Sequence, residues 1–138
     1  MPQKITTGYK ALLDAAEREI ETLSVEEARK LHGSADVTFV DLRDPRERDR
    51  EGKMPGAFHC TRGMLEFWID PESPYYKEKF GEDKKFVFFC AGGLRSALAA
   101  KTAQDMGLKP VAHILGGFKA WKDAGGPTEP GESKPPKK

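Results

Sequence analysis

Hydrophobic residues recur along the chain with two spacings, one typical of helices and one typical of buried strands. Between about residues 8 and 21 they return every three to four positions, which predicts an amphipathic helix with a charged outer face. Residues 37–40, 86–90 and 111–115 are short runs of apolar, aromatic and β-branched residues, which predict strands. The unbroken apolar run at 86–90 is typical of a parallel strand covered on both faces.

Capping residues mark where further helices begin. Ser24-Val25-Glu26-Glu27 is a capping box that opens a short helix ending near Gly33. Asp44-Pro45-Arg46-Glu47 places Asp at the N-cap, Pro at the first helical position and Glu at the third. Weaker patterns predict the remaining elements: a turn and short strand at 52–58, helices at 62–68 and 75–80, a helix at 96–106 stopped by Gly107, and a final helix after Gly116-Gly117.

Strands that alternate with helices predict an α/β domain with a mostly parallel sheet, whose ligands bind at the carboxyl ends of the strands. We divide the chain into an N-terminal extension with the amphipathic helix (1–23), the α/β domain (24–125) and a Pro-, Gly- and Lys-rich tail (126–138) that we expect to be disordered. The apolar stripe of the first helix must be covered by the domain itself or by a second copy of the chain, so a homodimer stays open.

Composition narrows the function classes. The 138 residues suffice for one core, and a formal net charge of +1 gives no electrostatic case for nucleic acid. No apolar run reaches the roughly 20 residues of a membrane span, and the first residues lack the apolar core of a secretory signal. Two cysteines do not make a disulfide scaffold, so we expect a reducing cytoplasm. The histidines have no zinc spacing, and we expect neither metal nor cofactor.

The run from Phe86 to Ser96 carries the candidate chemistry. Cys90 ends the apolar strand, two glycines follow, and Arg95 precedes an alanine-rich helix. In this order the backbone N–H groups of the loop converge at a helix N-terminus, which stabilises both a thiolate and an anionic substrate. The glycines permit the dihedral angles of a tight cradle, and the planar fork of Arg95 suits an oxyanion. Ser96 would cap the helix or donate a hydrogen bond into the pocket.

A lone cysteine in a strand is more often a small buried hydrophobic residue than a nucleophile. Here the thiol ends the strand and lies beside a glycine pair and an arginine, with no base nearby. We therefore interpret Cys90 as a nucleophile that attacks an electrophilic, anionic substrate directly as the thiolate.

Three motifs together resemble the signatures of the single-domain rhodanese family. Cys90-Ala91-Gly92-Gly93-Leu94-Arg95-Ser96 is similar to the active-site loop C-x-x-G-x-R-S. Val40-Asp41-Leu42-Arg43 with Gly52-Lys53-Met54-Pro55-Gly56-Ala57 resembles the amino-terminal signature, and Leu115-Gly116-Gly117-Phe118-Lys119-Ala120-Trp121 the carboxyl-terminal one. The resemblance implies a rhodanese-like domain, with a central, mostly parallel five-stranded sheet and helices on both faces, to which this chain adds an N-terminal helix.

The resemblance implies a sulfurtransferase that works through a cysteine persulfide. Cys90 would take the sulfane sulfur of a small anionic donor such as thiosulfate and pass it to cyanide or to a thiol, including a protein thiol. Arg95 would bind the oxyanion of the donor or product. The persulfide would be held by the backbone N–H groups of the loop: Ala91, Gly92, Gly93, Leu94, Arg95 and Ser96. Lys53 stands where the family has a histidine, and the loop carries no charged side chain besides Arg95, so the donor stays open.

Two other functions fit parts of the pattern. A thiol-dependent phosphatase or arsenate reductase would also use a loop cysteine and arginine, but the cysteine phosphatases place five residues between them, whereas four separate Cys90 from Arg95. A rhodanese-like binding or persulfide-relay module is the other alternative. Such scaffolds commonly lack the cysteine, so its presence favours an active enzyme.

Several other residues with reactive side chains are expected to serve the fold. Cys60 could resolve an oxidised or persulfidated Cys90 as a disulfide, but packing is the favoured interpretation. Asp41 and Arg43 are expected to form a structural ion pair. The remaining candidates are His32, expected on the surface; His59, His113 and Trp121, expected to be packing residues; and Arg62, Phe67 and Trp68, which either border the pocket or, as aromatic residues more often do, belong to the core.

Overall fold

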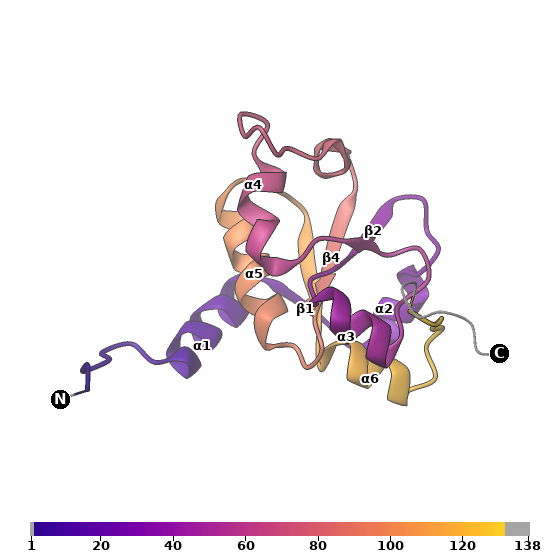
Figure 1. Ribbon diagram of the computed structural model, residues 1–138, viewed down its shortest axis with the longest axis horizontal. Coiled ribbons are helices and arrows are strands. Elements are labelled where there is room, and N and C mark those ends of the chain that lie inside the picture. Colours follow the sequence, from indigo (N-terminus) through magenta and orange to yellow (C-terminus); the bar gives the residue numbers. More distant parts are fainter. Residues whose placement is uncertain (1, 132–138) are drawn as a thin grey trace.

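The computed structural model describes residues 2–131, and its helices and strands alternate as the sequence predicts (Figure 1). The helices are α1 (Tyr9–Glu19), α2 (Val25–Leu31), α3 (Pro45–Glu51), α4 (Leu65–Ile69), α5 (Leu94–Asp105) and α6 (Gly117–Asp123), with 3-10 turns η1 (Arg62–Met64) and η2 (Glu78–Gly81). The strands are β1 (Glu21–Leu23), β2 (Val37–Asp41), β3 (Phe58–His59), β4 (Lys85–Phe89) and β5 (Val111–Ile114). None of the helices in the described part of the chain is long and apolar enough to cross a membrane.

The five strands form one parallel sheet in the order β1-β5-β4-β2-β3. The middle strand is β4, the strand that ends immediately before Cys90. Residues 86–89 of this strand are at most 1% exposed, because strands pair with it on both sides and helices cover both of its faces. The expected parallel sheet is confirmed, and the cysteine follows its best-protected strand.

Helices cover the two faces of the sheet. The core on one face includes Ile20 of α1, Leu65 of α4 and Ala100 of α5. The core on the other face includes Ala28 of α2 and Trp121 of α6. The expected arrangement of helices on both faces is therefore confirmed, and the expected core position of Trp121 agrees with its complete burial.

The first helix is shorter than its hydrophobic pattern suggests. It ends at Glu19, two residues before the predicted end, and residues 21–23 form the edge strand β1 beside β5. Leu23 lies three positions after Ile20, which is a helical spacing, yet its burial comes from strand pairing. Pairing with β5 thus determines the structure of residues 21–23, although their hydrophobic spacing favours a helix.

The apolar stripe of α1 is partly covered by the chain itself. Ala16 is buried, Leu13 packs against the core, and Gln104 of α5 donates a 2.8 Å hydrogen bond to the carbonyl of Glu19. The amino-terminal end of the helix extends away from the body of the molecule (Figure 1), where Tyr9 is 60% exposed.

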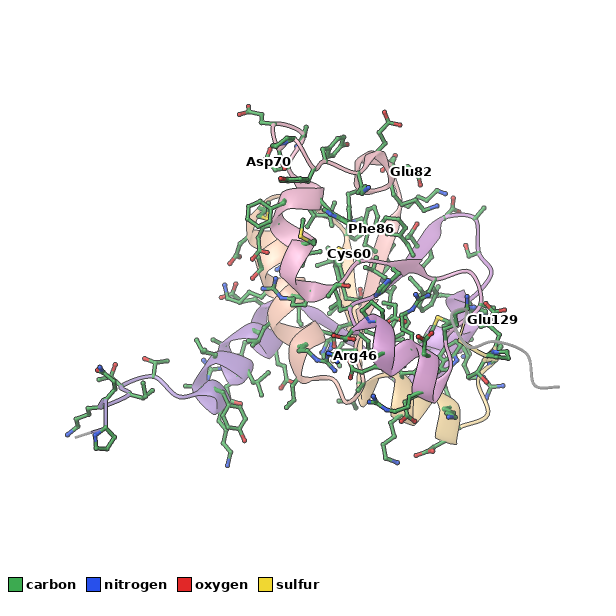
Figure 2. All side chains as sticks on the ribbon, in the orientation of Figure 1. Arg46, Cys60, Asp70, Glu82, Phe86 and Glu129 are labelled. Carbon is green, nitrogen blue, oxygen red and sulfur yellow. The ribbon has the colours of Figure 1, made fainter. Side chains whose placement is uncertain are left out.

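The start of the segment expected to be disordered is held against the domain. Lys53 and Glu129 exchange two backbone hydrogen bonds of 2.8 Å, and the indole N–H of Trp121 donates to the carbonyl of Pro127 at 2.7 Å. Glu129 is labelled in Figure 2. The composition of this segment predicts disorder, whereas the backbone groups of residues 126, 127 and 129 have partners within the domain. The expected disorder of the segment as a whole stays a prediction. Residues 132–138 of the predicted tail lie outside the described residues.

Both predicted capping boxes are present. The hydroxyl of Ser24 accepts a hydrogen bond from the N–H of Glu27, whose carboxylate accepts one from the N–H of Ser24. The carboxylate of Asp44 accepts from the N–H of Arg46 at 2.8 Å, and Glu47 accepts from the N–H of Asp44 at 2.9 Å. The second box matters for the site, because it fixes Glu47 on α3.

Candidate active site

Cys90 lies at the carboxyl end of β4 with its sulfur inside a cradle of backbone N–H groups. The N–H of Gly93 donates to Sγ at 3.2 Å, and the N–H of Ser96 donates at 3.3 Å. The cysteine is 1% exposed, so water competes little for these contacts. Hydrogen bonds to the charged form of an acid favour that form, and the N-terminus of α5 adds its dipole. The arrangement therefore stabilises sulfur as an anion.

The helix that follows the loop begins two residues earlier than its pattern predicts. Gly93 is its N-cap and has a φ of +101°, a left-handed conformation that glycine adopts without strain. The N-cap carries no side-chain hydrogen bond, so the capping role expected for Ser96 is wrong. Ser96 is the third residue of α5, and at this position its backbone N–H points toward the Cys90 sulfur.

The first turn of α6 holds the other side of the loop. The N–H of Phe118 donates to the carbonyl of Cys90 at 2.7 Å, and the N–H of Lys119 donates to the carbonyl of Ala91 at 3.1 Å. Gly117 makes this approach feasible: its φ is +65°, and a Cβ there would lie 2.7 Å from the Ala91 oxygen. The carboxyl-terminal glycine pair thus fixes the peptide units of the cysteine loop, a role that the sequence alone did not reveal.

Arg95 is held by a carboxylate from another element. Its Nη1 and Nη2 lie 2.9 Å from Oε1 and Oε2 of Glu47, a bidentate ion pair. The hydrogen bond from Arg95 lowers the pKa of Glu47 below its usual value, and the same bond raises the pKa of Arg95. The Cys90 sulfur contributes a smaller effect in the same direction on the pKa of Arg95. The sequence predicts the role of Glu47 in the helix cap but not its ion pair with Arg95.

The Ser96 side chain points into the protein. Its hydroxyl lies 2.9 Å from Nδ1 of His113, and both residues are buried. Burial lowers the pKa of His113 to about 4, so the imidazole is neutral near pH 7. The Nε2 atom of His113 is buried without a hydrogen-bond partner among the described residues. The hydroxyl therefore supports the loop from inside and does not donate into a pocket.

A cavity of about 480 Å³ opens beside the loop, between α3 and α6. Ala91 and Gly92 of the loop line this cavity, whereas Cys90, which is 1% exposed, does not. Leu94 is 56% exposed on the loop. The cavity is also lined by Arg43, Glu47, Arg50, Glu51, Phe118, Lys119, Lys122 and Asp123. The cavity beside the loop is thus lined by both basic and acidic side chains.

Asp41 and Arg43 form the structural ion pair expected from the sequence. Both are at most 1% exposed, and Arg43 donates from Nε and Nη2 to the two carboxylate oxygens at 3.0 and 2.8 Å. Arg48 adds a 3.2 Å contact to the same carboxylate. The Arg43 guanidinium also lies 4.1 Å from the centre of the Phe118 ring, which ties the end of β2 to α6.

Cys60 lies in the core and not in the cradle. It is fully buried among the residues beneath α4 and α5, and both cysteines are free thiols. Figure 2 labels it beside α4. Loss of hydration raises the pKa of Cys60 to about 12, so the thiol stays protonated at neutral pH. These observations support the packing role.

The remaining candidates have structural partners. His32, expected on the surface, is half-buried and donates from Nε2 to the carbonyl of Pro55 at 2.8 Å. His59 Nε2 donates to the carbonyl of Arg43 at 2.7 Å. The last group consists of Arg62, which pairs with Glu66; Trp68, which packs on the core; and Phe67, which is 52% exposed and does not line the cavity.

Comparison with known proteins gives a consistent assignment. Residues 24–124 match the Rhodanese-like domain family. The chain is 30% identical over 118 residues to the putative sulfurtransferase YtwF of Bacillus subtilis, covering 86% of this chain and 95% of that one. It is also 30% identical over 100 residues to the mouse thiosulfate sulfurtransferase/rhodanese-like domain-containing protein 3, of whose length the match spans 64%.

Two solved structures extend the comparison. A protein of unknown function and "possible tyrosine phosphatase" from Rhodopseudomonas palustris CGA009 is 72% identical, with a TM-score of 0.92 over 94% of this chain and 99% of that chain. The polysulfide-sulfur transferase homodimer of Wolinella succinogenes is 33% identical, with a TM-score of 0.67 over 91% of this chain and 88% of that one. On the sequence match and these structures, the chain belongs to the rhodanese-like family of proteins.

Proposed function

We propose that the protein is a sulfurtransferase that carries sulfane sulfur as a persulfide on Cys90. The observation that carries this proposal is the pair of N–H groups, from Gly93 and Ser96, directed at Sγ. Such donors favour the thiolate as nucleophile, and favour it again when the same sulfur acts as leaving group.

The reaction divides into two displacements at sulfur. The Cys90 thiolate attacks the outer sulfur of the donor, the donor's S–S bond breaks, and the departing group leaves with the electron pair. With thiosulfate, that group is sulfite. An acceptor thiolate then attacks the outer sulfur of the Cys90 persulfide, and the Cys90 thiolate is regenerated.

The surroundings of Cys90 fit direct attack without a general base. The histidine nearest the loop, His113, is buried and faces the Ser96 hydroxyl, not the sulfur. A thiolate held by N–H groups needs no proton removal at the moment of attack. We propose a thiol as the physiological acceptor and a reducing cytoplasm as the setting, because both cysteines are free.

A phosphatase is the second candidate, suggested by the description of the Rhodopseudomonas palustris protein. The four-residue spacing between Cys90 and Arg95 disfavours it, as does the engagement of both terminal nitrogens of Arg95 by Glu47. A phosphoryl group would have to bind through the remaining N–H donors of this guanidinium, beside the Glu47 carboxylate, which repels it.

Intact-protein mass spectrometry without reductant tests the proposal. The protein is measured before and after incubation with thiosulfate and with an alkyl hydropersulfide. We expect a gain of about 32 Da, the mass of one sulfur, that maps to Cys90 and disappears on adding a thiol or cyanide. Cys90→Ser should show no gain. No gain with either donor, together with hydrolysis of p-nitrophenyl phosphate, would overturn the proposal in favour of a phosphatase.

A further inference from the structure

We propose that Glu47 sets the charge beside the cysteine loop and directs the enzyme toward hydropersulfide donors and away from tetrahedral dianions such as thiosulfate. This inference rests on the proposed sulfurtransferase function. It identifies a specificity-determining residue outside the loop and the chemical class of the preferred donor.

The first observation is how completely Glu47 engages Arg95. Both of its carboxylate oxygens contact the guanidinium at 2.9 Å, so the two terminal nitrogens are occupied by a charge opposite to their own. The pair is partly shielded from water, with side-chain exposures of 21% for Glu47 and 41% for Arg95. Partial burial weakens screening, so the carboxylate offsets part of the positive charge that a dianion would seek.

The second observation is that Glu47 cannot easily turn away. One of its carboxylate oxygens also accepts a 2.9 Å hydrogen bond from the N–H of Asp44, in the capping box that opens α3. An oxyanion that drew Arg95 away would leave the Glu47 carboxylate, which lines the cavity, without its partner and close to that oxyanion. Like charges at such short range oppose binding.

The third observation is that three basic side chains that line the cavity, those of Arg43, Lys119 and Lys122, have partners of their own. Arg43 is paired with Asp41 inside the protein, and Lys119 is paired with Asp123 at 2.9 Å. Lys122 donates to the carbonyl of Glu51 at 2.9 Å. A dianion entering the cavity would therefore have to compete with an anionic or polar group at each of these cations.

A hydropersulfide makes no such demand. The Cys90 thiolate attacks the outer sulfur of R–S–SH, the S–S bond breaks, and the electron pair and the proton leave with R–SH, while the Cys90 persulfide anion remains. The charge stays on sulfur throughout, inside the cradle formed by the N–H groups of Gly93 and Ser96. No oxyanion forms that would need Arg95.

The experiment compares wild type with Glu47→Gln, in which the amide oxygen can still accept from Asp44 or Arg95 but the charge is gone. Initial rates of Cys90 persulfide formation are measured with thiosulfate and with an alkyl hydropersulfide. We expect kcat/KM for thiosulfate to rise about tenfold, mainly through KM, and kcat/KM for the hydropersulfide to change less than about twofold. The thiosulfate rate should also fall more steeply with added salt in the variant.

Glu66→Gln is the matched control, because Glu66 pairs with Arg62 at 3.0 Å and does not line the cavity. It should leave the ratio of the two donors unchanged. An unchanged or higher KM for thiosulfate in Glu47→Gln, in a variant that still takes up sulfur from the hydropersulfide, would overturn the inference and leave Glu47 as a positioning residue for Arg95. Failure of wild type to take sulfur from either donor would instead overturn the proposed function itself.

Discussion

The N–H of Phe118 donates a 2.7 Å hydrogen bond to the carbonyl oxygen of Cys90, so α6 holds the peptide unit of the proposed nucleophile. The two residues come from different sequence motifs, 28 positions apart. A carbonyl fixed toward α6 leaves the N–H groups farther along the loop free to face the sulfur. The shape of the cradle therefore depends on α6 as much as on the loop.

Gly117→Ala should disrupt this junction. Gly117 has a φ of +65°, and the added methyl group would overlap the carbonyl oxygens of Cys90 and Ala91. We expect a loss of at least about 2 kcal/mol in the free energy of unfolding, from left-handed strain and overpacking together. We also expect at least a tenfold slower uptake of sulfur by the folded protein. Urea unfolding and persulfide mass spectrometry measure the two effects.

Gly107→Ala is the control for Gly117→Ala. Its φ is +108°, but no atom of residues 2–131 lies within 4 Å of the added methyl group. It should cost about 1–2 kcal/mol from backbone strain alone and leave the rate of sulfur uptake unchanged. Equal effects of the two substitutions on that rate would contradict the role assigned to α6.

Arg95→Ala should affect donors unequally. Removing the guanidinium leaves the Glu47 carboxylate without its bidentate partner at the wall of the cavity. The uncompensated charge should reduce kcat/KM for thiosulfate at least tenfold, whereas the hydropersulfide reaction should fall only a few-fold. Equal losses with both donors would mean that Arg95 acts on the Cys90 sulfur and not on the donor's charge.

Cys60→Ala should keep the transfer reaction. The pKa of Cys60 is raised to about 12 by burial, so at pH 7.5 this thiol is almost entirely protonated and a poor nucleophile. The substitution removes one buried sulfur atom and should cost about 1 kcal/mol in the free energy of unfolding. Persulfide formation and its discharge by a thiol should proceed at the wild-type rate. A persulfide that loads but no longer discharges would show that Cys60 takes part in the reaction.

Acid should destabilise the fold through His113. Its pKa is about 4 in the folded protein against 6.5 for the exposed side chain, so the unfolded chain binds the proton first. The stability contributed by the neutral imidazole is complete above pH 6.5 and is lost as the pH falls from 6.5 to 4, by about 3 kcal/mol in total. His113→Asn should flatten the pH dependence of urea unfolding in this window. An unchanged slope would assign the acid sensitivity to other groups.

Much of the fold could be predicted from local signals. The buried run of β4, the two capping boxes and the stop at Gly107 each reflect an interaction within a few residues, and each is present in the structure. The edge strand β1 was missed because its three residues continue the helical spacing of α1 and become a strand only by pairing with β5. The contacts of residues 127 and 129 could not be predicted for a related reason, since their partners Trp121 and Lys53 lie outside the segment.

The candidate site likewise has a part that local sequence predicts and a part that depends on distant contacts. Cys90, Arg95 and the glycines of the loop form a contiguous motif, so their proximity follows from the sequence. The pairing of Arg95 with Glu47 spans 48 residues and depends on how α3 lies across the sheet edge. The capping box already accounts for a glutamate at position 47, so no local signal indicates that Glu47 also pairs with Arg95.

Glu47 and Cys90 lie on different segments of the chain, so the group proposed to select the donor and the group proposed to carry the sulfur are separate in sequence. The sulfur and its N–H cradle come from the loop after β4, whereas Glu47, the charge that we propose selects donors, comes from α3. A substitution at position 47 can therefore alter which donors are accepted while the persulfide chemistry stays intact.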